Sequence, residues 1–291
     1  MAILANSTAI LRSHRHLSAR RVLDRALRYA LLVVAALVVL TPVYLTVVNS
    51  LQPTARLFTY PPKLIVTEPQ WDTYRRAFEQ ASLGRYLFNS LLVTTLITTG
   101  QVVTSVLAAY AFAFLRFPLR NALFLLFMSS LMVPSEVTIV VNYETVAFLG
   151  WLDSYQGLVV PALATAFGTF LLRQAFLTVP RELQEAAWID GCGHLGFMVR
   201  ILVPVSRPAI AALAVFSFLM AWNQYLWPLL ITNEDRYRTV QIGLKMLVSH
   251  NFDEFNVVMA GTVIAAVPMF VLLVLFQQYL VRSLTAGAVK G

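Results

Sequence analysis

The stretch TVPRELQEAAWIDGCGHLGFMVRILVPVSRP, residues 178–208, is a polar and partly charged segment set between long apolar runs. Pro180 suits the first turn of a helix, and Glu182 places negative charge near the positive end of the helix dipole. Gly191 then favours a stop. The pattern predicts a helix from Pro180 to about Asp190, and a helix that short needs a packing partner to be stable in water.

This predicted helix offers a small apolar face and two carboxylates. Leu183, Ala186 and Ala187 follow the i, i+3, i+4 spacing of one helix face, and the alanines would let another backbone approach closely. Glu185 and Asp190 could pair with hydrogen-bond donors on a partner. We therefore interpret the stretch as a docking element for another protein, with a solvated amphipathic connector as the alternative.

The composition of the whole chain is that of a membrane protein. Of its 291 residues, 58% are hydrophobic and 12% are charged, which no ordinary soluble domain shows. The net charge of +8 does not indicate nucleic-acid binding, because the basic residues are spread between apolar runs and are not clustered with aromatic residues on a polar face. Their distribution points instead to orientation in a membrane.

The sequence carries no pattern for catalysis, metal binding or nucleotide binding. No GxxxxGK[ST] phosphate loop and no GxSxG turn occurs, and nothing resembles a channel filter or the repeated halves of a secondary transporter. The single cysteine, Cys192, excludes an internal disulfide and is interpreted as a small packing residue. The histidines have no ligand cluster around them, so no metal site is expected; they are His14, His16, His194 and His250.

The apolar runs predict an all-α membrane protein with six transmembrane helices. These expected spans are residues 29–48, 87–115, 122–141, 157–177, 209–231 and 257–281. Residues 1–28 form an arginine-rich arm, and the segments on its side of the membrane hold most of the Lys and Arg and few of the acids. By the positive-inside rule, both termini and the 178–208 stretch should be cytoplasmic, and residues 49–86 should be external.

One acidic residue lies inside a predicted span. Glu136 is costly in a bilayer, so it is a candidate for a solute path by default. Pro134, two residues earlier, removes a helix donor and favours a break at which a carboxylate could line a water-filled cavity. The alternative is that Glu136 simply lies at the level of the external headgroups.

The predicted span 209–231 ends in a second group of polar and aromatic residues. Asn223 and Gln224 could face a solute path or could hydrogen-bond to neighbouring helices. The aromatic side chains around them could stack on a sugar ring or anchor the span at the interface; they are Trp222, Tyr225 and Trp227.

The 178–208 stretch resembles the cytoplasmic loop signature of a known family, the membrane permease subunits of bacterial ATP-binding-cassette (ABC) importers. The residues that match this signature at the family's spacing are Glu185, Ala186, Ala187, Asp190, Gly191, Ile201 and Pro204. The segments WNQYLWPLL (222–230), LTAGAVKG (284–291), RFPLRN (116–121) and LDSYQGL (152–158) are similar to the carbohydrate branch, in particular to the second permease of maltose-type and glycerol 3-phosphate importers. Cys192 departs from the usual alanine.

The resemblance implies a type I ABC importer permease fold with a core permease domain at 87–281 and a cytoplasmic tail at 282–291. It also implies that the loop helix docks in a cleft of a separate ATPase, with the tail nearby. The coupling contacts would be Glu185, Ala186, Ala187, Asp190 and Gly191. Two ATPase subunits would bind ATP and Mg²⁺, so this chain would hold no cofactor and would not be an enzyme.

The implied assembly also contains a second homologous permease, an extracytoplasmic solute-binding protein and the bacterial inner membrane. The expected function is import of a sugar, a polyol or a glycerol 3-phosphate-type solute. The alternatives are import of another small solute, such as a peptide, an amino acid or an anion, or a role as a membrane scaffold or receptor subunit. In maltose-type relatives the partner permease can hold most or all solute contacts, which leaves open whether Glu136, Trp222, Asn223 and Gln224 touch solute here.

Overall fold

The computed structural model describes residues 2–61, 63–80, 82–250 and 254–286, with the backbone alone described at 2–23, 135, 250 and 279–286. The side chains of the arginine-rich arm before Asp24, with His14 and His16, therefore lie outside the described residues, as do the His250 side chain and the end of the tail at 287–291.

The described chain folds into helices without a strand. The elements of its first part are α1 (Ala2–Leu51), α2 (Thr54–Leu57), α3 (Asp72–Gln80), α4 (Leu83–Phe114), α5 (Arg120–Ser129), η1 (Ser130–Met132), α6 (Ser135–Phe148), α7 (Tyr155–Val159) and η2 (Val160–Ala162). The elements that follow are α8 (Ala166–Leu177), α9 (Arg181–Ile189), α10 (His194–Phe197), η3 (Met198–Leu202), α11 (Val203–Val205), α12 (Arg207–Trp222), α13 (Leu226–Ile231), α14 (Val240–His250) and α15 (Phe255–Ala286).

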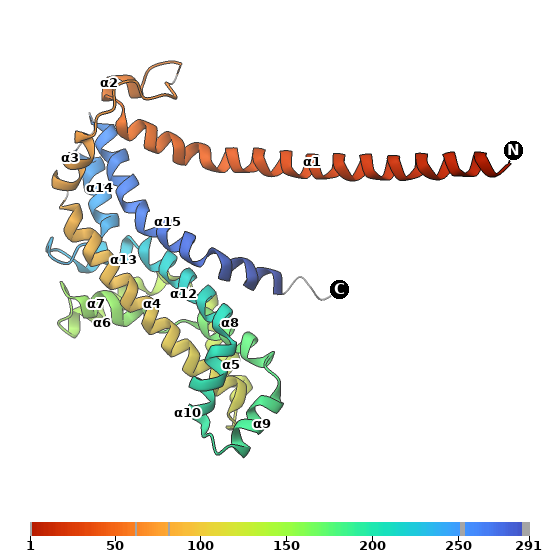
Figure 1. Ribbon diagram of the computed structural model, residues 1–291. Coiled ribbons are helices and arrows are strands. Elements are labelled where there is room, and N and C mark those ends of the chain that lie inside the picture. The colour runs from red at the N-terminus through yellow and green to blue at the C-terminus, as the bar shows by residue number, and fades with distance from the viewer. Residues whose placement is uncertain (1, 62, 81, 251–253, 287–291) are drawn as a thin grey trace.

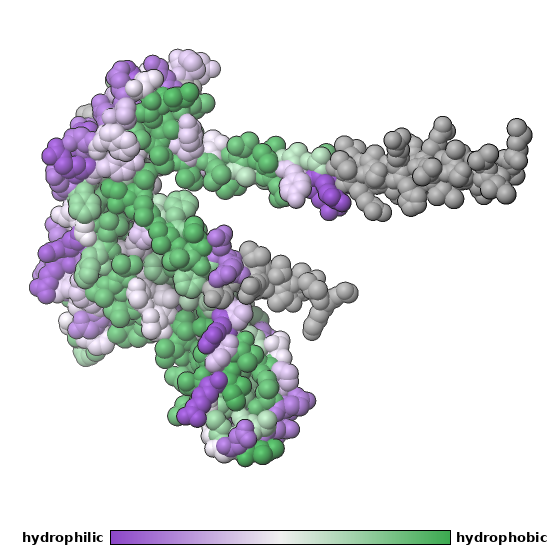
Figure 2. All heavy atoms as spheres, in the orientation of Figure 1, coloured by the Kyte–Doolittle hydropathy of each residue, from purple (hydrophilic) through white to green (hydrophobic). Residues whose placement is uncertain are grey.

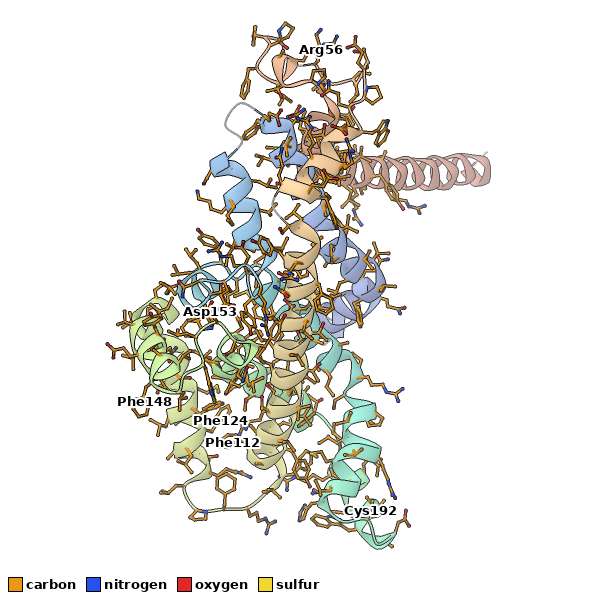
Figure 3. All side chains as sticks on the ribbon, turned by 90° about the vertical axis from the view of Figure 1, so that its left-hand side faces the viewer. Arg56, Phe112, Phe124, Phe148, Asp153 and Cys192 are labelled. Atoms are coloured by element: carbon orange, nitrogen blue, oxygen red, sulfur yellow. The ribbon has the colours of Figure 1, made fainter. Side chains whose placement is uncertain are left out.

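The helices form an elongated bundle from which α1 projects to one side (Figure 1). At one end lie α2, α3 and the start of α15, and at the opposite end lie α9 and α10. Figure 2 shows mainly apolar residues along the coloured part of α1 and through the middle of the bundle, with polar residues at the upper end and along the left-hand edge. In the view turned by 90°, Arg56 and Cys192 mark these two ends (Figure 3).

Three of the six predicted spans are continuous helices in the described part of the chain. The segments long and apolar enough to cross a bilayer unbroken are Asp24–Leu51, Leu83–Phe114 and Phe255–Gln278. They contain or overlap the expected spans 29–48, 87–115 and 257–281, so the apolar runs located these helices correctly.

The other three expected spans are not single straight helices. The expected span 122–141 is divided at Pro134, where Arg120–Met132 and Glu136–Phe148 meet at 101°. Tyr155–Ala162 and Ala166–Leu177 meet at 46°, which divides the expected span 157–177. The expected span 209–231 is interrupted between α12 and α13, and α12 itself meets the preceding helical segment at 80°. With each bent pair counted as one span, the described helices provide up to six.

Polar side chains on α4 satisfy backbone carbonyls at one of these breaks. The Gln101 side-chain amide donates to the carbonyl of Ala162 at 2.7 Å, and the Thr104 hydroxyl donates to the carbonyl of Leu163 at 2.7 Å. Because no water is available in a bilayer core, a helix can be interrupted there only if such donors are supplied by the protein. The bend between η2 and α8 therefore depends on the polar side chains of α4.

The same helix also fixes the connection that precedes α14. The Asn89 side-chain amide donates to the carbonyls of Arg236 and Arg238, at 2.9 and 2.8 Å. The Ser90 hydroxyl accepts a hydrogen bond from the Val240 backbone N–H at 2.8 Å. Asn89 and Ser90 are both buried, so α4 organises the bundle from one end to the other.

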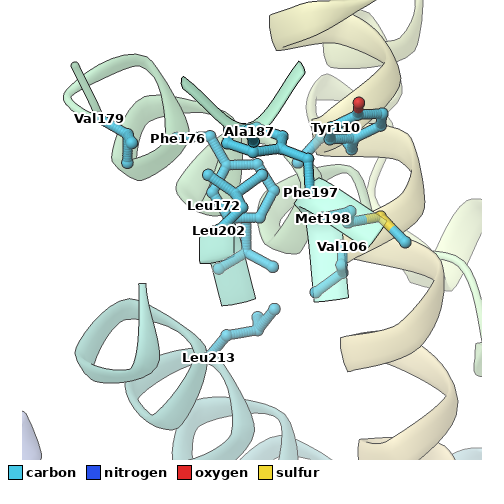
Figure 4. Packing of buried hydrophobic residues seen from close by; sticks show 11 residues of the cluster. Val106, Tyr110, Leu172, Phe176, Val179, Ala187, Phe197, Met198, Leu202 and Leu213 are labelled. Atoms are coloured by element: carbon cyan, nitrogen blue, oxygen red, sulfur yellow. The ribbon is translucent and has the colours of Figure 1, made fainter. Parts of the chain in front are cut away.

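The end of the bundle near α9 has its own apolar core, shown in Figure 4. Side chains from α4, α8, α9, α10, η3 and α12 pack together there. The central members, fully or almost fully buried, are Ala109, Leu172, Phe176, Ala187, Phe197, Leu202 and Leu213. The short elements α9 and α10 are therefore held on the transmembrane helices by apolar packing.

The first testable consequence concerns Gln101. In Gln101→Leu the partly buried carbonyl of Ala162 loses its donor, and leaving a polar group without a partner costs up to about 1–3 kcal/mol when it is fully buried. We expect a lower midpoint of thermal unfolding for the purified chain in detergent. Gln174→Leu, at an exposed site on α8, is the matched control and should unfold like the wild type. Equal midpoints for the two variants would contradict this role of Gln101.

Candidate functional site

The helix expected in the opening stretch is α9, and its ends are where the sequence indicated. Pro180 stands at the N-cap and Asp190 at the C-cap. Gly191 has a φ of +74°, which an L side chain rarely adopts. Its N–H donates to the Trp188 carbonyl at 3.0 Å, and the Cys192 N–H donates to the Ala187 carbonyl at 2.8 Å. These two bonds form a Schellman motif, which ends the helix and turns the chain toward α10.

The two alanines of α9 lie on different faces. Ala187 is 3% exposed and belongs to the apolar core at this end of the bundle, whereas Ala186 is exposed. The expected shared face of Leu183, Ala186 and Ala187 is therefore wrong, because burying Ala187 and Gln184 against the bundle turns the rest of the helix outward. The outward surface carries Glu185 and Ala186.

The outward surface of α9 and the turn after it combine apolar and acidic groups. Trp188 is 50% exposed and Ile189 is 87% exposed. Glu185 and Asp190 are exposed, and within the described residues neither carboxylate forms a salt bridge. Exposed apolar side chains beside unpaired charges are the composition of a protein-binding surface. Cys192 is half-buried and packs against the core beneath, as a small packing residue does.

A hydrogen bond connects this element to the long helix α4. The Tyr110 hydroxyl lies 2.7 Å from Nδ1 of His194, at the start of α10. The His194 ring also meets the Trp188 ring edge to face, with centroids 6.0 Å apart. Sequence patterns did not single out Tyr110 or assign a role to His194, because their partnership joins residues 84 positions apart.

A large cleft lies between α9 and the turn that joins α4 to α5. Its volume is about 1110 Å³, and its walls include Arg116, Arg120, Arg181, Glu185 and Trp188. Gln184 also lines it, and the side-chain nitrogen of this buried residue has no hydrogen-bond partner among the described residues. The cleft thus presents cationic groups and an unused donor beside the exposed surface of α9.

A second cavity, of about 320 Å³, lies where interrupted helices meet. Its lining comes from the start of α6, the end of η2 and the connection between α12 and α13. The residues are Glu136, Thr138, Ile139, Asn142, Pro161, Ala162, Gln224, Tyr225, Leu226 and Trp227. The break expected at Pro134 is present, and it is this break that brings Glu136 to the cavity wall.

The structure divides the residues predicted for a solute path into two groups. Glu136 and Gln224 line the cavity together. Trp222 does not, because it is 3% exposed and stacks on Phe218 with ring centroids 5.8 Å apart. Asn223 is exposed, and its side-chain amide donates to the Leu219 carbonyl at 2.8 Å as part of the C-terminal cap of α12. Neither residue is among the cavity's lining.

Asn142 is a cavity residue that sequence reasoning missed. It follows Glu136 by six positions and Ile139 by three, so all three fall on one face of α6. That spacing was the available signal, but it has meaning only if the helix begins at Pro134. An unbroken helix from 122 to 141 would have ended before Asn142.

Asp153 holds the loop before α7 against the far end of α13. Its backbone N–H donates to the Ile231 carbonyl at 2.9 Å, and its carboxylate accepts hydrogen bonds from the backbone of Asn233 and Glu234. Partial burial by itself would raise the pKa of Asp153, but these hydrogen bonds outweigh it and the net pKa is lowered. The carboxylate therefore stays charged at neutral pH and keeps α13, with Trp227, in place.

Among the residues that the structure describes, no three His, Cys, Asp or Glu side chains come together in a way that could hold a metal ion.

Comparisons with known proteins agree with this architecture. The family described as "Binding-protein-dependent transport system inner membrane component" matches residues 101–286. The sn-glycerol-3-phosphate transport system permease protein UgpE of Rhizobium meliloti is 38% identical over 274 residues, which cover 91% of this chain and 97% of that protein. The protein of the same name from Agrobacterium fabrum is 39% identical over 273 residues, with the same coverage.

A solved structure shows the same fold. A chain of a bacterial ABC transporter involved in the import of the acidic polysaccharide alginate superposes with a TM-score of 0.77 at 21% identity, covering 87% of this chain and 95% of that one. A second chain, from the bacterial alginate ABC transporter in complex with an alginate pentasaccharide-bound periplasmic protein, has a TM-score of 0.59 at 15% identity and covers 86% and 92%. The chain therefore belongs to the family of binding-protein-dependent transport system inner membrane components, as a membrane-embedded permease subunit of an ABC importer and not a catalytic subunit.

Proposed function

We propose that the chain forms half of the translocation path of an ATP-driven importer for a sugar, a polyol or a glycerol 3-phosphate-type solute. Two ATPase subunits bind ATP and Mg²⁺, a second homologous permease completes the path, and an extracytoplasmic binding protein delivers the solute. Both termini and α9 lie in the cytoplasm in this proposal. The names of the relatives, which are sn-glycerol-3-phosphate permeases, support the solute class.

The observation that carries the proposal is the surface of α9. This short helix is anchored to the bundle through Ala187 and exposes Glu185, Ala186, Trp188 and Ile189. An anchored element with an unpaired carboxylate and exposed apolar side chains can receive a rigid partner and pass its movement to the transmembrane helices. We assign the ATPase contacts to Glu185, Ala186, Asp190 and Gly191, with Ala187 as their support.

The first helix supports the proposal of a second permease. From Asp24 to Leu40 the side chains of α1 are exposed, and the helix contacts its own bundle mainly near its C-terminal end, through α15 and α3 (Figure 1). Apolar surface of this extent has to be covered by lipid or by another chain. A helix that leaves its own bundle in this way suits an assembly in which the first helix of one permease packs against the other permease.

The two ends of the bundle suit different partners. The end opposite α9 is built by α2, α3 and the start of α15, and an ion pair between Arg76 and Glu254 at 2.7 Å joins α3 to the residues before α15. The Asn256 side chain donates to the Gln52 carbonyl at 3.0 Å and links α15 to the end of α1. This ordered polar end is where we place the binding protein, and one of the solved alginate transporter structures is a complex with a periplasmic protein.

The rival solutes and roles have less support. The relatives named above are sn-glycerol-3-phosphate permeases, and neither carries the name of a peptide, an amino acid or an inorganic anion. A scaffold or receptor role would leave the cavity and the interrupted helices around it without a purpose. Transport accounts for both the α9 surface and the cavity.

Reversing the charge of Glu185 tests the coupling assignment. Loss of one partner of a buried interfacial charge pair costs about 2–5 kcal/mol, so Glu185→Lys should lower ATP-dependent solute uptake by the complete importer at least about tenfold. The variant should still reach the membrane, because Glu185 is exposed and makes no described intramolecular salt bridge.

Glu144→Lys is the matched control, since Glu144 is exposed on α6 and away from α9. It should transport at the wild-type rate. Normal uptake by Glu185→Lys at equal membrane levels would show that α9 is not the coupling element.

The hydrogen bond between Tyr110 and His194 gives a second test, of how movement of α9 reaches α4. Tyr110→Phe keeps the ring that packs against Phe114 and removes only the hydroxyl. One hydrogen bond contributes about 0.5–1.5 kcal/mol, so we expect the ratio of solute transported to ATP hydrolysed to fall about two- to tenfold.

A purely structural role for Tyr110 would lower the amount of folded protein and leave this ratio unchanged. Tyr29→Phe, at an exposed position of α1, is the control. An unaltered ratio in Tyr110→Phe would exclude the bond from the coupling pathway.

A further inference from the structure

The cavity of about 320 Å³ between α6, η2 and α13 has the size of a small-solute site. Ligand pockets start at about 300 Å³, so the cavity has room for one small polyol or one sugar ring. The polar side chains of its wall determine which hydrogen bonds and which charges a solute would meet there.

Four of these side chains have no hydrogen-bond partner among the described residues. They are the Glu136 carboxylate, the amides of Asn142 and Gln224, and the Tyr225 hydroxyl. None is among the buried unsatisfied atoms, so each stays accessible from the cavity or from outside it. Together they offer acceptors and donors in a small space, which matches the hydroxyl groups of a polyol, each of which donates one hydrogen bond and accepts others.

The apolar part of the wall is fixed in place. Trp227 is 7% exposed, and its indole N–H donates to the Gly157 carbonyl at 3.1 Å. Because that donor is already used, the Trp227 ring can meet a solute only through its carbon atoms. Leu226 and Ile139 complete the apolar surface. A sugar ring or a polyol presents C–H groups to such a surface and hydroxyls to the polar side.

The charge of the wall decides between neutral and anionic solutes. Among the described residues that line the cavity, none is Lys, Arg or His, and Glu136 is the single acid. Glu136 lies in the first turn of α6, where the helix dipole stabilises a carboxylate. A phosphate group beside it would meet a like charge and no cation, whereas phosphate sites in proteins are built from Arg, Lys or clustered N–H donors.

We infer that this cavity is a subsite for a neutral, hydroxyl-rich solute, and that Glu136 accepts hydrogen bonds from its hydroxyls and disfavours phosphate esters. The inference rests on the proposed transport function and sharpens it. The chain then differs in solute class from its relatives named for sn-glycerol 3-phosphate, although it shares their fold and their family.

The test uses the complete importer, reconstituted in vesicles with its own binding protein and ATP. Uptake is measured for neutral polyols and sugars, for sn-glycerol 3-phosphate and for sugar phosphates, each at saturating binding protein. We expect the preferred solute to carry no phosphate. With that solute, Glu136→Gln should lower the uptake rate about three- to tenfold, because the amide is a weaker acceptor, and Glu136→Asp should retain more activity than Glu136→Gln.

Glu144→Gln is the matched control, since Glu144 is exposed on the same helix and does not line the cavity. It should transport at the wild-type rate. A preference of the wild type for a phosphate ester, or an unchanged rate in Glu136→Gln, would overturn the inference and leave the importer function intact. A wild-type assembly that transports no solute under ATP would instead overturn the proposed function, and the inference with it.

Discussion

A backbone carbonyl freed by a helix break inside a bilayer must find a donor within the protein, and in this chain α4 provides it. Gln101 and Thr104 bond the carbonyls of Ala162 and Leu163, where η2 gives way to α8. Near the other interruption, the Gln241 side-chain amide donates to the Trp222 carbonyl at 3.3 Å, at the end of α12. The bent helices are therefore supported by specific polar side chains, which explains why polar residues occur in these apolar segments.

The helix breaks, whose backbone carbonyls are hydrogen-bonded in this way, create the cavity. A straight helix would carry Glu136 past the bundle, but the 101° bend at Pro134 turns it toward the residues that follow α12. The end of η2, with Pro161 and Ala162, closes the third side. Polar groups that would be destabilising on a lipid-facing helix become a small, mixed polar and apolar wall. The same carboxylate that makes the wall suitable for hydroxyl groups makes it unsuitable for phosphate.

The long helix α4 also connects this wall to the surface proposed for the ATPase. Gln101 supports the break beside the cavity, and Tyr110 forms a hydrogen bond with His194 at the start of α10, the helix that follows α9. Gln101 and Tyr110 are nine positions apart, about 14 Å along the axis at the helical rise per residue, in one rigid element. A shift of α9 against the bundle thus acts on the same helix that holds η2 and α8 in their bent arrangement. Movement at one end can then change the shape of the cavity without an intervening flexible segment.

The sequence by itself determined the class and much of the local structure. Runs of about twenty apolar residues can only be membrane helices, so α1, α4 and α15 were located from composition. Proline and glycine chemistry is local, which is why the ends of α9 at Pro180 and Gly191 and the break at Pro134 were predicted correctly. The tertiary contacts of each side chain could not be predicted in this way, because hydrogen bonds and packing join residues that are far apart in the sequence.

Only the tertiary structure placed Trp222 in the core, joined Glu136 to Gln224 and Asn142, and turned Ala187 inward while Ala186 stayed outside. The bond between Tyr110 and His194 likewise had no pattern that could reveal it. Periodicity states which residues share a face of one helix, but the direction of that face depends on how the broken helices bend against α4.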